Sequence, residues 1–329
     1  MIGTALAHPN IALIKYWGKR EPGSNVPATG SLSITLDALT TRTRVEFDST
    51  LARDELLLDG EPDAAALTRV SSCLDALRDL ASDHRRARVE TNNDFPTAAG
   101  LASSASGFAA LVVAAAAALD LELDRRTLSK LARRASGSAA RSLHGGFVVL
   151  HAGRDDDDDP AAQPLLDANE WPLSVVIAVT ARAPKKTGSR AGMQSSRHTS
   201  PFYPSWVAAA DQDLAVAQAA VLARDFAQLA EISEHNCLKM HAVMYSSRPP
   251  LIYWNGATVE CMRRLRELRE REGAQVFFTI DAGPQVKAIC IPQDAPRVAA
   301  VLREVTGVES AGIGGIGEGA KLLHSGETA

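Results

Sequence analysis

The chain has 329 residues, of which 46% are hydrophobic and 22% are charged, a composition that is ordinary for a globular protein. Its length exceeds the usual size of a single core and predicts two domains that share a cleft. The formal net charge of -4 gives no general electrostatic argument for binding nucleic acid or an anionic membrane, so a phosphorylated ligand would need a local basic cluster.

The first third of the chain alternates strand-like runs with turn signals. Helical spacing of apolar residues predicts a helix over residues 63–81, and the Pro- and Gly-containing segment 20–30 is expected to be a loop. Strands are expected at residues 4–7, 10–17, 31–37, 43–48 and 86–91.

The stretch NNDFPTAAGLASSASG, residues 92–107, is a loop of small residues that runs into a helical segment at 108–121. Backbone N–H groups at a helix N-terminus attract anions, so this loop is a candidate phosphate-binding loop. It lacks the lysine of a Walker A loop and would hold a nucleotide with amides and hydroxyls. The alternative is that the small residues only let a buried helix pack closely against its neighbour.

The remaining elements follow in a mixed order. We interpret the acidic run 155–159 as a solvated loop, because neighbouring Asp side chains cannot converge on one metal ion. Helices are expected at 124–136, 206–222, 225–243, 257–272 and 294–305, and strands at 147–151, 173–181, 275–280 and 286–291. This order predicts an α+β protein whose domains divide near residues 160–185.

The N-terminus and the cysteines indicate the cellular compartment. The N-terminal MIGTALAHPN has no basic region followed by an apolar core, so we expect no signal peptide. The four cysteines are scattered without C-x-x-C spacing, which is typical of reduced thiols in a cytoplasmic protein. The apolar run at 111–121 is too short to span a bilayer. We therefore expect a cytoplasmic protein.

Two segments combine small residues with cations. In NIALIKYWGK, Lys15 and Lys19 lie four apart within an apolar strand pattern; the alternative is a strand edge whose lysines reach solvent. In SGSAARS, Ser136, Ser138 and Arg141 suit anion binding, because the planar guanidinium can grip a carboxylate or phosphate bidentately. The alternative there is an ordinary helix cap beside a surface arginine.

Two further segments follow predicted central strands. KKTGSRAGM, residues 185–193, brings basic and hydroxyl groups into a loop, and the alternative is a solvated connection. FFTIDAGP places Asp281 at the end of an apolar strand, before a turn. A turn-initiating Asp is common. The functional alternative is a catalytic carboxylate aimed into a cleft.

Taken together, five motifs resemble those of the diphosphomevalonate decarboxylases, ATP-dependent enzymes of the mevalonate pathway in the GHMP kinase superfamily. They are NIALIKYWGKR, PTAAGLASSASG, SGSAARSLHGGF, KKTGSRAGM and DAGPQVK, spread from about residue 5 to 290. The resemblance covers nearly the full chain. It implies a two-domain α+β, GHMP kinase-like fold with the active site in the cleft between an ATP-binding domain, residues 1–175, and a C-terminal domain, residues 176–329.

The resemblance implies that ATP and Mg²⁺ support decarboxylation of (R)-5-diphosphomevalonate to isopentenyl diphosphate, CO₂, ADP and phosphate through a 3-phosphorylated intermediate. It also implies a homodimer, with a phosphorylated small molecule as partner and neither nucleic acid nor membrane. The alternatives are a phosphomevalonate decarboxylase, a mevalonate-type kinase and a non-catalytic nucleotide- or metabolite-binding protein. Thr29 and Gly30 depart from the eukaryotic pattern, and related decarboxylases use the monophosphate, so the number of substrate phosphates stays open.

Residue roles also come from the resemblance. Asp281 would be the catalytic carboxylate beside the C3 hydroxyl, and Arg141 would hold the substrate carboxylate with support from Asn10. The other implied substrate ligands are Lys15, Tyr16, Lys19, Ser136, Ser138 and Ser189. The implied nucleotide ligands are Pro96, Gly100, Leu101, Ala102, Ser103, Ser104, Lys185 and Lys186, with Ser104 beside Mg²⁺.

Overall fold

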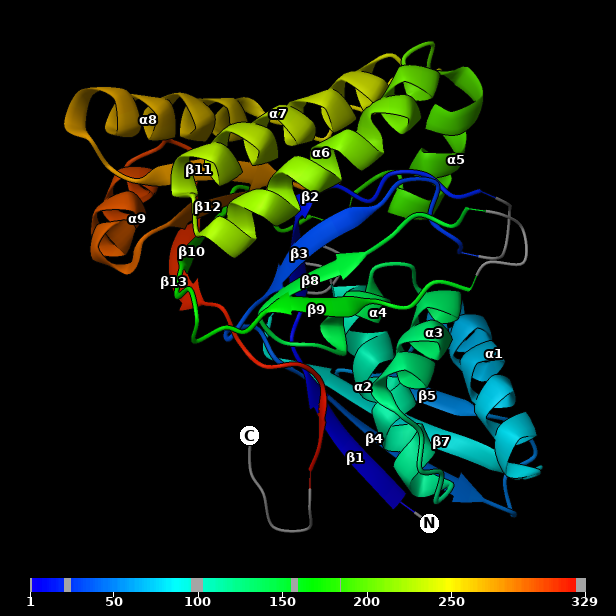
Figure 1. Cartoon of the computed structure of the whole chain (residues 1–329). Helices are drawn as coiled ribbons and strands as arrows, with labels where there is room; N and C mark the ends of the chain where they lie inside the picture. Colours follow the sequence, from blue (N-terminus) through cyan, green and yellow to red (C-terminus); the bar gives the residue numbers. More distant parts are fainter. Residues whose placement is uncertain (1, 21–24, 96–102, 155–158, 184, 324–329) are drawn as a thin grey trace.

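The computed structural model describes residues 2–20, 25–95, 103–154, 159–183 and 185–323 (Figure 1). The predicted nucleotide ligands Pro96, Gly100, Leu101 and Ala102, part of the predicted loop 20–30 and most of the acidic run lie outside these residues. The strands form three sheets, and helices pack against them (Figure 1). The predicted α+β class is confirmed.

A six-stranded sheet forms the half of the molecule that contains the N-terminus. Its order is β14 (Lys321–Leu322), β1 (Ile2–Ala7), β4 (Thr41–Asp48), β7 (Arg86–Asn93), β5 (Glu55–Leu58) and β6 (Glu61–Pro62). β5 runs parallel to β7, and the other pairs are antiparallel. β4 alternates between buried and more exposed residues, so one face carries the core and the other faces solvent.

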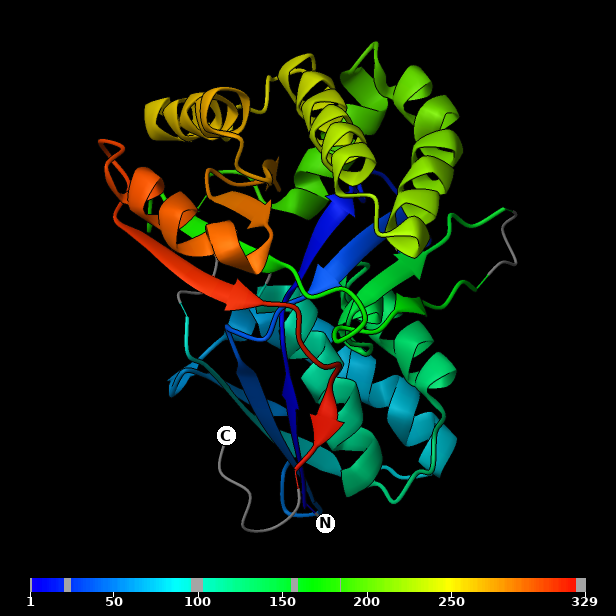
Figure 2. The same cartoon turned by 60° about the vertical axis from the view of Figure 1, so that its left-hand side comes forward.

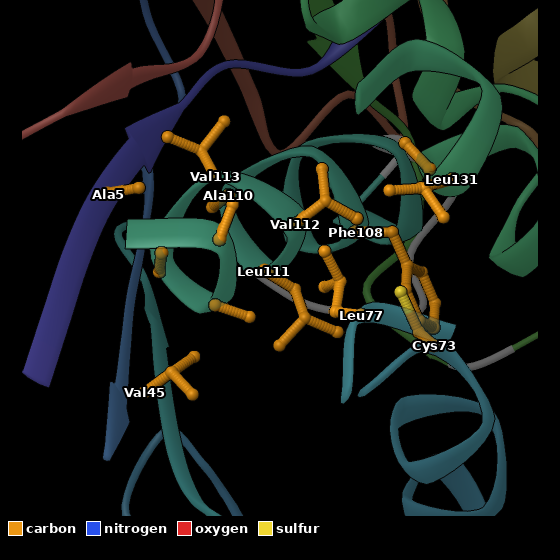
Figure 3. Packing of buried hydrophobic residues seen from close by; sticks show 14 of the residues in the cluster. Ala5, Val45, Cys73, Leu77, Phe108, Ala110, Leu111, Val112, Val113 and Leu131 are labelled. Carbon is orange, nitrogen blue, oxygen red and sulfur yellow. The ribbon is translucent and has the colours of Figure 1, made fainter. Parts of the chain in front are cut away.

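Three helices lie on the inner side of this sheet; the first two contact its strands, and the third packs on the other two. They are α1 (Ala64–Ala81), α2 (Ser103–Ala118) and α3 (Arg125–Ala135). α2 is buried on nearly all sides, and Figure 3 shows its apolar side chains between the strands that carry Ala5 and Val45 and the neighbouring helices. A Cβ at Gly3 would lie only 2.0 Å from the Ala114 carbonyl oxygen, so the small residues permit close strand–helix contact.

Two four-stranded antiparallel sheets lie beyond the first. One has the order β2 (Asn10–Ile14), β3 (Ser31–Thr35), β8 (Phe147–Leu150) and β9 (Gln163–Leu166), and the other β11 (Val276–Ile280), β12 (Val286–Cys290), β10 (Ser174–Val179) and β13 (Ser310–Gly315). Every residue of β2, β3, β8, β11 and β12 is buried. Burial on both faces explains the mostly apolar sequences of β2, β8, β11 and β12, whereas β3 alternates buried polar and apolar residues.

Helices α6 (Tyr203–Ala223) and α7 (Phe226–Tyr245) join these two sheets. Leu214 and Leu229 from the two helices share one core with Ile11 of β2 and Phe277 of β11. The other face of the β11-containing sheet is covered by α8 (Gly256–Glu272) and α9 (Ala295–Arg303), preceded by the short helix η1 (Pro292–Asp294). Asp225 and Asn255 cap α7 and α8 by accepting first-turn N–H bonds.

Several elements differ from the sequence prediction. The predicted loop 185–193 is wrong from Ser189 onward, because residues Ser189–Thr199 form α5, whose Met193 packs beside Trp17. The glycine-rich end contains β13, and the short elements β5, β6, β9 and α4 (Ala139–Ser142) were not predicted. No described helix is long and apolar enough to cross a membrane. After β13 the chain returns to the first sheet, where β14 pairs with β1 (Figure 2).

Candidate active site

A cavity of about 650 Å³ is lined by residues of two sheets, including Val89 of β7 and Ala12 of β2, and by Asp281 in the turn that follows β11 of the third sheet. This volume suits a small-molecule ligand. Lys186 is exposed and does not line the cavity. The predicted site residues that do line it are Asn10, Lys15, Tyr16, Lys19, Ser103, Ser104, Ser136, Ser138, Arg141, Lys185, Ser189 and Asp281.

Asp281 lies between two buried lysines. Its Oδ1 is 2.7 Å from Nζ of Lys15 and its Oδ2 is 3.3 Å from Nζ of Lys287, while 27% of its side chain stays exposed to the cavity. Burial alone would raise the pKa of this carboxyl, but the two ammonium groups hold it well below its usual range. The carboxylate is therefore ionised at neutral pH and partly accessible to a ligand.

The local sequence explains where Asp281 points. The apolar β11 ends at Ile280, and the Gly283 N–H donates a 2.7 Å hydrogen bond to the Asp281 carbonyl oxygen, which closes a tight turn. β12 then runs back and brings Lys287 beside the carboxylate. The predicted strand-end position of Asp281 is thus confirmed, and the side chain faces the cavity.

Arg141 is buried in a cradle of neutral groups. Its Nη1 donates to Ser31 Oγ at 2.7 Å and its Nε to Ser33 Oγ at 3.1 Å, while Asn10 Oδ1 accepts from Nε and Nη2 at 3.3 and 3.2 Å. Asn10 is fixed in turn by donating to Ser142 Oγ at 2.8 Å. Among the described residues, no carboxylate forms an ion pair with Arg141. Burial lowers its pKa to about 10, so it still carries its charge at neutral pH.

Tyr16 and the serines of the 136–141 segment lie close together. A Cβ at Gly137 would be only 2.3 Å from the Tyr16 hydroxyl oxygen, so glycine is required for this approach. Within the described parts of the chain the buried Tyr16 hydroxyl has no hydrogen-bond partner, and burial raises its pKa to about 12. Ser136 and Ser138 have their hydroxyl oxygens 3.5 Å apart. These hydroxyls are donors suited to a polar ligand.

The described lining of the cavity carries six cationic side chains against two carboxylates, those of Asp63 and Asp281. The excess is local, because the whole chain has a net charge of -4. Burial, together with repulsion from two arginines, lowers the pKa of Lys19 to about 8. The six cations are Lys15, Lys19, Arg69, Arg141, Lys185 and Arg190. Such a concentration of positive charge favours a polyanionic ligand.

Lys185 is tied to the Asp281 turn. Its Nζ donates to the Ala282 carbonyl oxygen at 3.0 Å and to Ser189 Oγ at 2.8 Å. Burial lowers its pKa, and the nearby Asp281 opposes that effect. Lys185, predicted beside the nucleotide, and Ser189, predicted beside the substrate, are therefore brought together at one wall of the cavity.

Two family models match the chain. The diphosphomevalonate decarboxylase-like N-terminal domain matches residues 7–162, and the mevalonate 5-diphosphate decarboxylase C-terminal domain matches residues 175–316. The diphosphomevalonate decarboxylase of Aspergillus fumigatus is 36% identical over 332 aligned positions, which cover 95% of this chain and 82% of the relative. The chain belongs to the diphosphomevalonate decarboxylase family.

Solved structures of the diphosphomevalonate decarboxylase family share the fold. Mevalonate diphosphate decarboxylase from Staphylococcus aureus is 38% identical, with a TM-score of 0.92 over 98% of this chain and 99% of that one. A complex of MDDEF with MVAPP, AMPPCP and magnesium is also 38% identical, with a TM-score of 0.91 and 99% of each chain covered. The predicted family resemblance and the two-domain GHMP kinase-like fold are confirmed.

The described residues fit ATP and Mg²⁺ as expected for a diphosphomevalonate decarboxylase. Ser103, Ser104 and Gly107, from the first turns of α2, line the cavity, and a helix N-terminus attracts phosphate. Leu56 and Phe108 supply apolar wall suited to a nucleoside base. The described residues contain no group of three or more His, Cys, Asp or Glu side chains that could hold a metal ion. Mg²⁺ usually keeps several waters and is bound through substrate phosphates and one or two carboxylates, and the cavity-lining hydroxyl of Ser104 is the protein group that the resemblance predicts beside it.

Sequence reasoning missed several polar residues of this decarboxylase-family site. Lys287 carried the same sequence signal as Lys15, a lysine within an apolar strand pattern, and could have been found by it. Ser31 and Ser33 alternate along β3, but only the fold places them against Arg141. Arg69 had no signal, because it lies on α1, which reaches the cavity through tertiary packing; Arg190 lay within the basic segment 185–193 but was given no role. The residues that the sequence prediction left out of the site are thus Ser31, Ser33, Arg69, Arg190 and Lys287.

Proposed function

We propose that the protein catalyses the ATP-dependent decarboxylation of (R)-5-diphosphomevalonate to isopentenyl diphosphate, CO₂, ADP and phosphate. One observation carries this proposal: an ionised carboxylate, Asp281, and a buried guanidinium, Arg141, that has no ion-pair partner among the described residues, face the same cation-rich cavity. A substrate that carries a carboxylate, a hydroxyl and phosphates needs this combination. Membership of the family supports the same activity.

Arg141 would bind the substrate carboxylate. Its hydrogen-bond partners among the described residues are neutral and orient the guanidinium without pairing its charge, so a ligand anion would supply that pairing. Lys19, Arg190, Tyr16, Ser136 and Ser138 would bind the 5-diphosphate, since charged and neutral donors gather at that wall. Ser189 and Lys15 would complete the substrate contacts near the reacting carbon.

Asp281 would act on the C3 hydroxyl. Because its pKa lies well below the usual range, it is a weak base, and its main contribution is electrostatic. It would accept a hydrogen bond from the hydroxyl and later oppose the positive charge that develops at C3. Asp281 would therefore contribute both to phosphorylation of the C3 hydroxyl and to the decarboxylation that follows.

The chemical sequence follows from the poor leaving ability of a tertiary hydroxyl. The C3 oxygen attacks the γ-phosphorus of ATP, the bond to ADP breaks, and the hydroxyl proton passes to an oxygen of the transferred phosphoryl group. The C3–O bond then breaks with both electrons leaving on phosphate, and the C–CO₂ electrons form the alkene as CO₂ departs. Mg²⁺ bound with ATP would neutralise charge on its phosphates, with Ser104 as the described hydroxyl that we propose beside it.

The proposal also includes the domain boundary, the lysines that bind the nucleotide, the oligomeric state and the cellular location. We keep the division into residues 1–175 and 176–329, which the separate family models over 7–162 and 175–316 support. Lys185 and Lys186 are kept as nucleotide ligands, although Lys186 would have to reach the nucleotide from an exposed position. A homodimer and a cytoplasmic location are proposed from the family resemblance and the reduced cysteines; all four cysteines are free in the structure.

The decisive assay incubates the purified protein with ATP, Mg²⁺ and either mevalonate 5-phosphate or 5-diphosphate, and measures ADP and CO₂ in parallel. We expect equal amounts of ADP and CO₂ with the diphosphate. CO₂ from the monophosphate alone would identify a phosphomevalonate decarboxylase. ADP without CO₂ would identify a kinase, and neither product would identify a binding protein.

A further inference from the structure

Asn236 of α7 contacts the main chain of Lys15, far from it in sequence. Lys15 follows β2, which ends at Ile14, so its N–H has no strand partner. Asn236 Oδ1 accepts this N–H at 2.8 Å, and Asn236 is 1% exposed. A buried N–H without a partner would cost free energy comparable to a lost hydrogen bond. The amide therefore replaces the missing strand partner at the residue whose Nζ touches Asp281.

The orientation of this amide is fixed by a carboxylate. Asn236 Nδ2 donates to Asp213 Oδ2 of α6 at 2.6 Å, and the same oxygen lies 2.5 Å from Nζ of Lys239. An ionised carboxylate only accepts hydrogen bonds, so it can face only the NH₂ group of Asn236. The amide oxygen is thereby turned toward Lys15. Asp213, Asn236 and Lys15 form one directed chain of hydrogen bonds.

The same helical turn also contacts the other half of the ion pair. Cys237 Sγ accepts the Ile280 N–H at 3.2 Å, and Ile280 directly precedes Asp281. Asn236 and Cys237 are both fully or almost fully buried. α7 thus holds the chain beside Lys15 and beside Asp281 from one rigid element, which fixes their separation.

We propose that Asn236 is a positioning residue for the reaction, acting through Lys15, and that Asp213 sets its orientation. Lys15 bonds with its Nζ to the Ala12 carbonyl oxygen at 2.8 Å as well as to Asp281, so its side chain is extended between two fixed acceptors. A shift of its main chain would move the ammonium group away from Asp281 and misalign that carboxylate. This inference rests on the proposed decarboxylase activity.

The test begins with Asn236→Leu, which has similar volume but offers no hydrogen bond. We expect kcat for ADP and CO₂ formation to fall by at least about tenfold, since small misplacements of reacting groups are costly, while KM for ATP stays within about twofold. Ser233→Ala is the matched control, because Ser233 is buried one turn earlier on α7 and its hydroxyl has no partner among the described residues. Its kcat should stay within about twofold of wild type.

Exchanging the Asn and the Asp between positions 236 and 213 makes the test independent of whether the leucine variant folds. Asn236→Asp places two carboxylates together and should lower kcat, whereas adding Asp213→Asn restores one donor and one acceptor between the positions. We expect the double variant to recover to within about threefold of wild type. A double variant no better than Asn236→Asp alone, or a folded Asn236→Leu protein with wild-type kcat, would overturn the inference. A wild-type protein that forms neither product would instead overturn the proposed function.

Discussion

Arg78 and Arg141 are about equally buried, with 3% and 2% of their surfaces exposed, but their charges are satisfied by different partners. Arg78 of α1 makes two 3.0 Å hydrogen bonds to the carboxylate of Asp54. Arg141 bonds to one amide and two hydroxyls, all neutral. The first arginine lies under the six-stranded sheet, and the second lines the cavity.

The electrostatics of the two regions differ accordingly. Burial alone would lower the pKa of Arg78, but its bonds to Asp54 and Asp75 raise it overall. Burial lowers the pKa of Arg141, which has no such partner among the described residues. A buried charge that is paired inside the protein serves the fold, whereas one held by neutral groups is available to an anionic ligand. Stability should therefore depend on Arg78, and activity on Arg141.

The largest effect is expected for Arg78→Met, which removes a guanidinium and leaves the buried Asp54 carboxylate unpaired. The free energy of unfolding should fall by about 3–5 kcal/mol, the usual cost of breaking a buried pair on one side. Urea unfolding followed by circular dichroism measures it. The kcat of the folded protein should stay unchanged, and a variant of normal stability but impaired kcat would break the comparison.

Asp281→Asn tests the one carboxylate in the site that is ionised between two lysines. The amide is nearly isosteric and keeps one acceptor oxygen for Lys15, but it cannot offset positive charge at C3. We expect the rate of phosphoryl transfer to fall by at least about 10²-fold. Single-turnover kinetics measures that rate, with the unfolding midpoint as control. Full activity in the folded variant would make Asp281 a turn residue only.

Arg141→Lys keeps the positive charge but removes the planar fork. We expect kcat/KM to fall by about 10- to 100-fold because a bidentate carboxylate contact becomes a single contact. The unfolding midpoint should change less than in Arg78→Met, since no carboxylate loses its partner. Comparing the two variants in one denaturant series sharpens the contrast between the arginines. Near wild-type activity would exclude Arg141 from the substrate contacts.

The smallest effect concerns Lys19, a partly buried cation whose Nζ donates to the neutral Asn25 amide oxygen. With its pKa lowered from 10.5 to about 8, the group loses its proton in the free enzyme as pH rises through that value. We expect kcat/KM for the phosphorylated substrate to fall a few-fold between about pH 7 and 9, and Lys19→Arg to flatten this profile because Arg stays charged.

The contribution of Lys19 to folding stability has the opposite pH dependence. Because the folded pKa of Lys19 is lowered, the unfolded chain binds more protons between about pH 8 and 10.5, so this group makes the protein more stable as pH rises through that window.

The activity prediction for Lys19 has its own contradicting outcome. A pH profile of kcat/KM that is identical in wild type and Lys19→Arg would show that another group titrates.

Local sequence determined the parts of this protein that depend on near neighbours. The apolar β11 followed by Ala-Gly-Pro was enough to place Asp281 at a strand end, whereas the small residues around Ser138 marked the Arg141 segment without predicting that it forms α4. The long helices α1, α6, α7 and α8 were predicted close to their observed bounds, because apolar spacing and capping residues act within a few turns. The motifs also identified the family.

Tertiary structure alone decided how these pieces meet. Lys287 joins Asp281 because β12 folds back beside β11, and Asn236 reaches Lys15 because α7 packs on the end of β2. α5 was unpredictable from its polar, glycine-containing sequence, since it is stabilised by packing of Met193 beside Trp17. These partners lie far apart along the chain. The charge and burial that give the site its chemistry are properties of the assembled neighbours, and no local pattern encodes them.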